Sequence, residues 1–231
     1  MTQGEIGFAL QNSMQRSFRT QGMNRSVVTI ITQVIVDKND PAFQRPTKPI
    51  GPFYSKEVAD RKRKELHWSI IEDATRGYRR VVASPIPKDI VELDIIKDCL
   101  SQNIVVIAVG GGGIPVILEN GEMHGVEAVI DKDRASALLA AKLGIEHLMI
   151  STEVPQVYIN YKKPNQKILR NLSVSEVKKF IAEKQFYEGS MLPKIEAALD
   201  FLSSGGKVVT ITNPEHILQA LDGRAGTRIT L

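Results

Sequence analysis

The sequence predicts an α/β protein in which a mostly parallel sheet lies between helical layers. Short apolar runs rich in β-branched residues alternate with longer segments of helical periodicity, and glycine or proline bounds most of them. The chain has 231 residues, of which 42% are hydrophobic and 24% charged, as in an ordinary soluble globular protein. A chain of this size can bury a substantial core.

The first two elements are a helix and a strand. Ile6, Leu10, Met14 and Phe18 recur every fourth residue, which predicts an amphipathic helix that Gly22 can end. The β-branched run over residues 26–36 predicts a buried strand. The chain therefore begins on a helix, with no strand before it to pair in a parallel sheet.

Residues 37–88 differ in character from the rest of the chain. Their six prolines cluster at the two ends of the segment, where a chain would turn on leaving and rejoining a compact domain. Between them we expect a short helix opened by Ser55 and strands over 68–72 and 78–82. The sequence thus predicts an inserted lid subdomain at 37–88, carried by a core formed from residues 1–36 and 89–231.

Alternation of strand and helix resumes at Asp89, with a helix expected over 90–101 and a buried strand over 104–109. Four glycines, Gly110, Gly111, Gly112 and Gly113, follow at the carboxyl end of that strand. Successive glycines can turn their N–H groups toward one anion, but a run of glycines also forms simple tight turns. It is neither a Walker loop, which needs a closing Gly-Lys-Ser/Thr, nor a G-x-G-x-x-G loop, because Pro115 occupies the last glycine position.

A second candidate motif is the run Asp131-Lys132-Asp133, which follows a hairpin predicted at Asn120-Gly121. Asp133 can cap a helix that runs through Leu143. The two aspartates fit a turn and a cap as well as catalysis. A possible anion cradle followed by a lysine between two carboxylates, at a helix amino terminus, favours phosphate chemistry over purely structural turns.

The remaining chain continues the alternation. We expect strands over 147–151, 157–161, 207–212 and 227–231, and helices over 173–184, 191–202 and 214–221, the first of them opened by a Ser173–Glu176 capping box. Ligands of open α/β sheets bind at the carboxyl ends of the strands. Residues 110–113, 151–153 and 189–194 are therefore expected to converge there.

Composition argues against several classes of partner. No apolar run approaches the roughly 20 residues needed to cross a bilayer, and no signal-peptide pattern opens the chain, so we expect no membrane contact. The net charge of +4 is dispersed, and the basic run 61–64 fits a solvated helix face, so we expect no nucleic-acid partner. The single cysteine, Cys99, suits a reducing cytoplasm and is expected on a buried helix face. The four histidines show no metal-ligand spacing, and no protein metal site is expected.

Longer motifs point to one family. The segments GGGGIPVI, GVEAVIDKD and GSMLPKIEAA, with DPAFQRPTKPIGPFY and GYRRVVASPIP upstream, resemble the carbamate kinases of the amino-acid kinase superfamily. The motifs occur in order along the whole chain. The resemblance implies the amino-acid kinase fold and the activity of an ATP-dependent phosphotransferase that reversibly converts carbamate to carbamoyl phosphate. It also implies that the protein is a cytoplasmic homodimer.

The resemblance also implies roles for four catalytic residues. Lys194, at a helix amino terminus, would hold the transferring phosphoryl group, and Lys132 would lie over the same oxygens. Lys48, in the lid, would close over the carbamate. Asp133 would orient the lysines, and Asp131 would be a helper or a neighbour of a metal ion. Gly110 to Gly113 would bind phosphate or substrate.

The purine nucleotide is expected along residues 151–161 and against the start of the helix at 191. Glu153 departs from the aspartate that many superfamily members carry in this turn, and Tyr158 and Met191 fit an apolar core as well as a base pocket. Any metal would be Mg²⁺ carried by the phosphates of ATP or ADP. The nucleotide-binding residues implied are Ser151, Thr152, Glu153, Tyr158, Gly189, Met191 and Pro193.

Two family motifs do not occur in these residues. Members of the family open with a strand and a Gly-Gly-Asn-Ala loop, followed by a strand that ends in His-Gly-Asn-Gly. We therefore expect a sheet truncated at its amino end, and a chain that alone is impaired, poorly soluble or associated. A non-catalytic protein of this fold, and a kinase for another small acid, remain alternatives.

Overall fold

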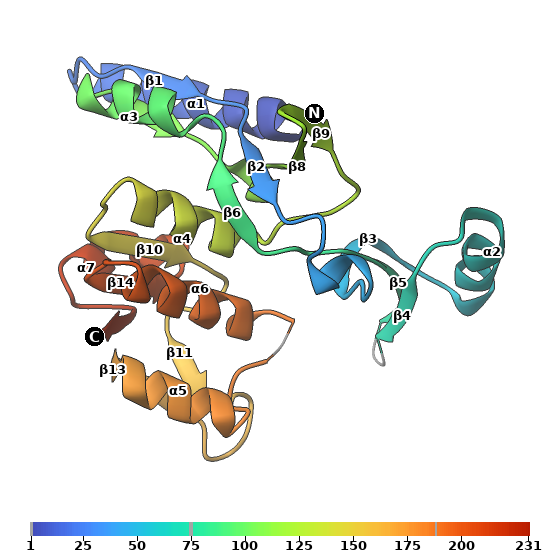
Figure 1. The fold of residues 1–231 in the computed structure, drawn as a ribbon. Coiled ribbons are helices and arrows are strands. Elements are labelled where there is room, and N and C mark those ends of the chain that lie inside the picture. The colour runs from blue at the N-terminus through green and yellow to red at the C-terminus, as the bar shows by residue number, and fades with distance from the viewer. Residues whose placement is uncertain (1, 74–75, 188) are drawn as a thin grey trace. The chain divides into compact units, whose positions relative to one another are not determined.

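A computed structural model describes residues 2–73, 76–187 and 189–231 (Figure 1). The chain forms two compact units, of which the first ends at Lys132 and the second begins at Asp133. Helices alternate with strands in both units, which confirms the α/β class, and the sheets are mixed. The sequence offered no signal for a boundary at 132/133, which lies at the start of a helix. The division into a core and an inserted lid stays a prediction.

The first unit opens with helix α1 (Thr2–Thr20), followed by strands β1 (Val27–Thr29) and β2 (Gln33–Val36). The single strand expected over 26–36 is thus wrong, because the chain breaks at Thr32. The Thr32 hydroxyl donates to the carbonyl of Ile30, and the side-chain amide of Gln3 exchanges two hydrogen bonds with the Thr32 backbone. The two halves consequently join different sheets.

Helix α1 forms as expected, and Met14 and Phe18 of the predicted apolar face are partly buried, but the first half of that face is not. Ile6 and Leu10 are about half exposed, whereas Gly7 is buried against β1. A Cβ atom at position 7 would lie 2.2 Å from Cγ2 of Thr29, so only glycine permits this close approach. The buried side of α1 is therefore set by its smallest residue, which an apolar periodicity does not reveal.

Residues 37–88 contain a three-stranded antiparallel sheet of order β3-β5-β4 and one helix. Ser55 caps the helix by accepting from the amide of Val58. Strand β3 was not expected, because it contains Pro49 and Pro52, but an edge strand tolerates residues that cannot donate to a ladder. The elements are η1 (Pro41–Phe43), β3 (Lys48–Tyr54), α2 (Lys56–Leu66), β4 (Ile70–Asp73) and β5 (Gly77–Val82).

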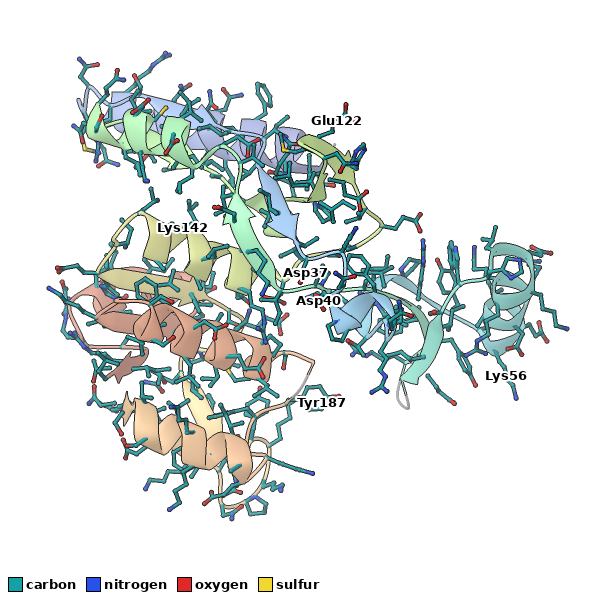
Figure 2. The ribbon with its side chains drawn as sticks, in the orientation of Figure 1. Asp37, Asp40, Lys56, Glu122, Lys142 and Tyr187 are labelled. Carbon is teal, nitrogen blue, oxygen red and sulfur yellow. The ribbon has the colours of Figure 1, made fainter. Side chains whose placement is uncertain are left out.

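Asp40 joins the entry and the exit of this segment (Figure 2). Its Oδ1 accepts from the amide of Ala42 at 2.8 Å, and its Oδ2 accepts from the amide of Ile86 at 2.9 Å. One carboxylate thus fixes two stretches of chain that are 46 residues apart. The neighbouring Asp37 makes only a local bond, to the amide of Asn39.

The rest of the first unit contains two pairs of parallel strands, β1 with β7 and β2 with β8. Ile90 belongs to β6 and not to the helix expected over 90–101, and Cys99 on α3 is only half-buried. The hairpin at Asn120-Gly121 is confirmed, since both residues have positive φ. The elements are β6 (Pro87–Ile90), α3 (Leu93–Ser101), β7 (Val105–Ile107), η2 (Gly110–Gly112), β8 (Ile114–Glu119) and β9 (Glu122–Gly125).

The second unit has a sheet of order β10-β14-β15-β13, and α6 packs on β10 and β14 (Figure 1). Buried apolar residues of α6, including Ile195, Phe201 and Leu202, face Val209 and Ile211 of the sheet in one core. Strands β12 and β13 were not expected. The elements are α4 (Lys132–Lys142), β10 (His147–Ser151), β11 (Val157–Ile159), β12 (Lys167–Leu169), β13 (Asn171–Ser173), α5 (Val174–Ala182), α6 (Met191–Ser203), β14 (Val208–Thr212), η3 (Pro214–His216), α7 (Ile217–Leu221) and β15 (Thr227–Thr230).

Within residues 2–73, 76–187 and 189–231, no helix is both long and apolar enough to cross a bilayer.

Candidate active site

A buried ion pair joins the two helices that carry predicted site residues in the second unit. Nζ of Lys194, in the first turn of α6, lies 2.8 Å from Oδ2 of Asp133 at the start of α4. The two side chains are only 9% and 10% exposed. Burying an ammonium group is costly unless it is paired and hydrogen-bonded, which the Asp133 carboxylate provides here. This pairing of Lys194 with Asp133 places a cation at a helix amino terminus.

A second ion pair, missed in the sequence, reinforces the first. Arg134 follows Asp133 on α4, and its guanidinium lies 2.7 Å from Oε2 of Glu196 and 3.6 Å from Oδ2 of Asp200, both on α6. Two successive residues of α4, Asp133 and Arg134, therefore form ion pairs with α6, and these pairs fix how far one helix can slide along the other. Glu196 and Asp200 lie two and six residues after Lys194, but nothing in the sequence marks Arg134 as their partner.

Asp133 is not a helix cap. Helix α4 begins at Lys132, so Asp133 lies inside its first turn and its carboxylate accepts from Lys194. The expectation that Asp133 caps the helix is wrong, because the helix already begins one residue earlier, at Lys132. Lys132 itself is exposed at the first position of the helix.

The glycine run in the first unit forms a tight, strained turn. Val109 has φ +48°, and Gly111, Gly112 and Gly113 have φ between +66° and +103°. A positive φ is costly for a β-branched residue such as Val109. The amides of Gly112 and Gly113 donate to the carbonyls of Val109 and Gly110. The turn itself therefore engages these two amides, and a bound anion would depend on those of Gly110 and Gly111.

Thr32 braces this turn from the β1–β2 break. It is fully buried, and its Oγ1 accepts from the amide of Val109 at 3.0 Å. The same threonine is held by Gln3 of α1 through bonds of 3.0 and 3.2 Å. Gln3 and Thr32 thus hold Val109 in its unfavourable conformation. The sequence reasoning missed both residues, since a threonine in a β-branched run predicts only a strand.

The turn also contacts the backbone just before Asp131. A Cβ atom on Gly112 would lie 2.2 Å from the carbonyl oxygen of Ile130, so glycine is required there. Asp131 is buried and forms an ion pair with Nζ of Lys48, the first residue of β3. The first unit thus brings together the glycine turn, Asp131 and Lys48. Lys48 is 83 residues away from Asp131 in the sequence.

The predicted nucleotide residues lie at the carboxyl end of β10 and the start of α6. Ser151 ends β10 opposite Thr212, the last residue of the parallel strand β14. Thr152 donates its amide to the carbonyl of Thr212, which holds the turn containing Glu153. These positions agree with the expected carboxyl-end location within this unit. Exposed side chains are those of Ser151 and Glu153, whereas Thr152 and Pro193 are half-buried and Gly189 lies on the surface before α6.

Met191 and Tyr158, two of the predicted nucleotide-binding residues, have different surroundings in the structure. Met191 packs against the buried core, as its alternative interpretation predicted. Tyr158 of β11 lies with its ring centroid 5.7 Å from that of Tyr161. The Tyr158–Tyr161 pair offers aromatic surface, whereas Met191 is partly committed to the core. Among residues 2–73, 76–187 and 189–231, no group of three or more His, Cys, Asp or Glu side chains is placed to hold a metal ion.

Comparisons with known proteins agree with this arrangement. Residues 55–213 match the model of the amino acid kinase family. The chain is 48% identical over 229 residues to a carbamate kinase of Thermococcus kodakarensis, covering 99% of this chain and 73% of that protein. It is 53% identical over 230 residues to carbamate kinase 3 of Staphylococcus aureus, covering 99% and 74%.

A solved structure agrees with the sequence relatives. The carbamate kinase of Giardia lamblia bound to AMP-PNP superposes with a TM-score of 0.89 at 42% identity, covering 100% of this chain and 73% of that one. Identity at this level over the whole chain, together with the family match, decides the assignment. The chain belongs to the amino acid kinase family and, within it, to the carbamate kinases.

Proposed function

We propose that this chain transfers a phosphoryl group reversibly between ATP and carbamate, with Lys194 as the residue that binds the transferring group. The observation that carries the proposal is the buried Lys194–Asp133 pair at the start of α6. Phosphoryl transfer needs positioned positive charge more than covalent chemistry. A lysine that a carboxylate holds in place before substrate arrives supplies that charge without reorganisation.

The partial positive charge of the α6 amino terminus adds to that of Lys194. Asp133 orients the Lys194 ammonium, and Lys132, exposed at the start of α4, is proposed to contact the same phosphoryl oxygens. The Arg134–Glu196 pair keeps α4 and α6 in register, so that Asp133 remains opposite Lys194. Arg134 is therefore a positioning residue and not a catalytic one.

Lys48 and Asp131 are proposed to serve the small acid. Lys48 begins β3 of the lid segment, and its ammonium is held by the buried Asp131. Carbamate carries one negative charge, which a lysine can neutralise. The amides of Gly110 and Gly111 are the proposed donors of the adjacent glycine turn, while Gly112 and Gly113 shape it.

The nucleotide is proposed to lie along residues 151–161 and 189–194. The relative from Giardia lamblia was solved with AMP-PNP, an ATP analogue, which supports a nucleotide site in this chain. Mg²⁺ is proposed to arrive on the nucleotide phosphates, where it would neutralise charge on the β- and γ-oxygens. The carboxylates of Asp131 and Asp133 each contact a lysine. They are therefore proposed to lie near the Mg²⁺ ion without forming a protein metal site around it.

The test is synthesis of ATP from ADP and carbamoyl phosphate, followed by coupled luminescence. We expect ATP to form with carbamoyl phosphate, to require Mg²⁺ and to stop when the metal is chelated. Acetyl phosphate is the matched control, because it differs mainly in replacing an amino group with a methyl group. Equal rates with both donors would assign the chain to another small acid, and no ATP from a folded chain that binds ADP would indicate a non-catalytic protein.

The assembly and the compartment are also proposals. We propose a homodimer, which light scattering of the purified chain would test, with a monomer at all concentrations as the contradicting result. We propose a cytoplasmic location, which the presence of a single half-buried cysteine supports. Cell fractionation with the protein in the membrane pellet would contradict it.

A further inference from the structure

The second unit contains a small cavity that shares no charged residue with the proposed phosphoryl-transfer site. Its volume is about 130 Å³, well below the roughly 300–1,000 Å³ of pockets that bury whole drug-sized ligands. The floor is a row of residues across the sheet, in which Arg228 of β15 lies between Asn171 of β13 and Thr210 of β14. The loop between α7 and β15, residues 223–226, forms part of the wall.

The lining is rich in hydrogen-bond donors and positive charge. Three arginines line it, Arg170, Arg224 and Arg228, together with Gln156 and Asn171. No aspartate or glutamate lines the cavity in the part of the chain that the structure describes. A cavity lined by guanidinium groups without a carboxylate favours an anion, since guanidinium groups present paired N–H donors that match phosphate oxygens.

Two of the three arginines have no carboxylate partner among residues 2–73, 76–187 and 189–231. Arg224 pairs with Asp222 at 2.6 Å, but no carboxylate among the described residues lies within ion-pair distance of Arg170 or Arg228. The backbone brings these two together, because the amide of Arg228 donates to the carbonyl of Arg170 at 2.8 Å. Both side chains are exposed, and an anion bound beside them would neutralise charge that no carboxylate of the described residues balances.

We propose that this cavity is a second anion site, which binds a phosphate-sized oxyanion, free or as the phosphate of a small metabolite, between Arg170 and Arg228. Its size excludes a whole nucleotide. Gln156 is the only lining residue in the segment 151–161 proposed for the nucleotide, so the two sites adjoin through that segment but use different charged groups.

The experiment titrates the ¹⁵N-labelled full chain with inorganic phosphate at constant ionic strength and follows the Nε–Hε signals of its arginines. We expect saturable shifts of the Arg170 and Arg228 signals, with acetate shifting them less because a carboxylate presents two oxygens. Arg170→Gln and Arg228→Gln should each weaken binding about tenfold or more, the usual effect of losing a charged hydrogen bond. Lys178→Gln, which removes an exposed cation of α5, is the matched control and should change nothing.

His147 offers an independent readout. Its Nε2 lies 2.8 Å from Oγ1 of Thr210, and partial burial together with the charge of Arg228 lowers the pKa of His147 below its usual value. Phosphate beside Arg228 would offset that charge and raise the pKa of His147. A glycerol phosphate arm separates a metabolite phosphate from the free ion, since tighter binding than inorganic phosphate would identify the esterified group as the ligand.

Three results would overturn the proposal. Linear, non-saturating shifts at Arg170 and Arg228 would indicate only general ionic effects. Unchanged affinity in Arg170→Gln, whose side chain is exposed and whose loss need not disturb the fold, would exclude the site. Complete displacement of phosphate from Arg228 by stoichiometric ADP would make the cavity part of the nucleotide site, whereas failure of ATP synthesis leaves this proposal unaffected.

Discussion

At the scale of single residues, a buried carboxylate holds each of the two lysines proposed for phosphoryl transfer and acid binding. Lys194 pairs with Asp133 in one unit and Lys48 pairs with Asp131 in the other. A lysine with four rotatable bonds loses considerable entropy on being positioned, and the carboxylate offsets that cost before substrate binds. Each ion pair also contributes to the stability of the fold. A mutational test therefore has to separate loss of stability from loss of catalysis.

Lys194→Gln should lower kcat by at least about 10²-fold, the usual cost of one preorganised donor. It should also destabilise the fold, since removing one member of a buried ion pair costs about 3–5 kcal/mol. The double variant Asp133→Asn/Lys194→Gln replaces the pair with neutral amides and should recover stability without activity. Melting curves and ATP synthesis separate the two effects, with Lys178→Gln as the control. Parental kcat in Lys194→Gln would remove Lys194 from the mechanism.

The pH dependence of stability should reflect His147. The unfolded pKa is about 6.5 and the folded pKa is lower, so the unfolded chain binds a proton first as pH falls. Stability from this group is complete above pH 6.5 and is lost as pH falls through the folded pKa. Glu119 and Glu176 have pKa values lowered from 4.5, so their contribution is lost only in more acidic solution.

Denaturant unfolding of the parent and His147→Gln between pH 7.5 and 5 would measure this effect. The variant should lose less stability than the parent over that range. Identical pH profiles for the parent and His147→Gln would show that the imidazole does not couple to folding.

At the scale of elements, the glycine turn and the lid segment depend on close contacts rather than on composition. Gly112 permits η2 to lie against Ile130, and Thr32 with Gln3 fixes the break between β1 and β2. Asp40 closes the lid segment at its base, and Lys48 ties β3 to Asp131. Residues 37–88, the predicted lid, are therefore attached to the rest of the first unit by specific polar contacts.

Gly112→Ala should destabilise the first unit by several kcal/mol. The residue has φ +103°, and the new Cβ would lie 2.2 Å from a backbone oxygen, so the turn has to shift. Gly125→Ala is the matched control, because a Cβ there would meet nothing within 4 Å. Chemical denaturation measures both variants, and equal stability of the two would show that the turn relaxes without cost.

Asp40→Ala should loosen the base of the lid and raise the KM for carbamoyl phosphate more than the KM for ADP. The substitution leaves the amides of Ala42 and Ile86 without their acceptor, at a cost of about 1–3 kcal/mol. Faster hydrogen exchange of the Ile86 amide would report the loosening directly. Asp37→Ala, a neighbour with only a local bond (Figure 2), should leave both measurements unchanged. A KM change confined to ADP would reverse the assignment of the lid to the acid.

At the scale of the whole molecule, the two units divide the proposed work. The first unit, which ends at Lys132, carries Lys48 and the glycine turn, and the second carries Lys194 and the nucleotide segment. The ligands should therefore protect different units from solvent.

Hydrogen exchange of the full chain should show that ADP alone protects residues 151–161 and 189–194 in the second unit. Carbamoyl phosphate alone should protect the segment around Lys48 in the first. Helix α3 (Leu93–Ser101) serves as the internal control, since it carries no proposed ligand contact. Protection by ADP confined to the first unit would contradict the placement of the nucleotide.

The sequence by itself determined the elements that local interactions decide. The Ser173–Glu176 capping box and the Asn120-Gly121 hairpin both formed as expected. These features depend on a few neighbouring residues, so a short stretch of sequence contains the information. The long motifs likewise identified the family, because they are read as sequence.

Only the tertiary structure decided which residues meet. Lys48 and Asp131 are 83 residues apart, Lys194 and Asp133 are 61 apart, and Thr32 and Val109 are 77 apart. Local pattern alone predicted Asp133 as a helix cap and Thr32 as a strand residue. It gave no special role to Gly7. Each of these residues contacts a partner distant in sequence: Asp133 the ammonium of Lys194, Thr32 the amide of Val109, and Gly7 the methyl group of Thr29. Such contacts decide the structure because hydrogen-bonding a buried polar group and packing closely contribute more free energy than local propensity does.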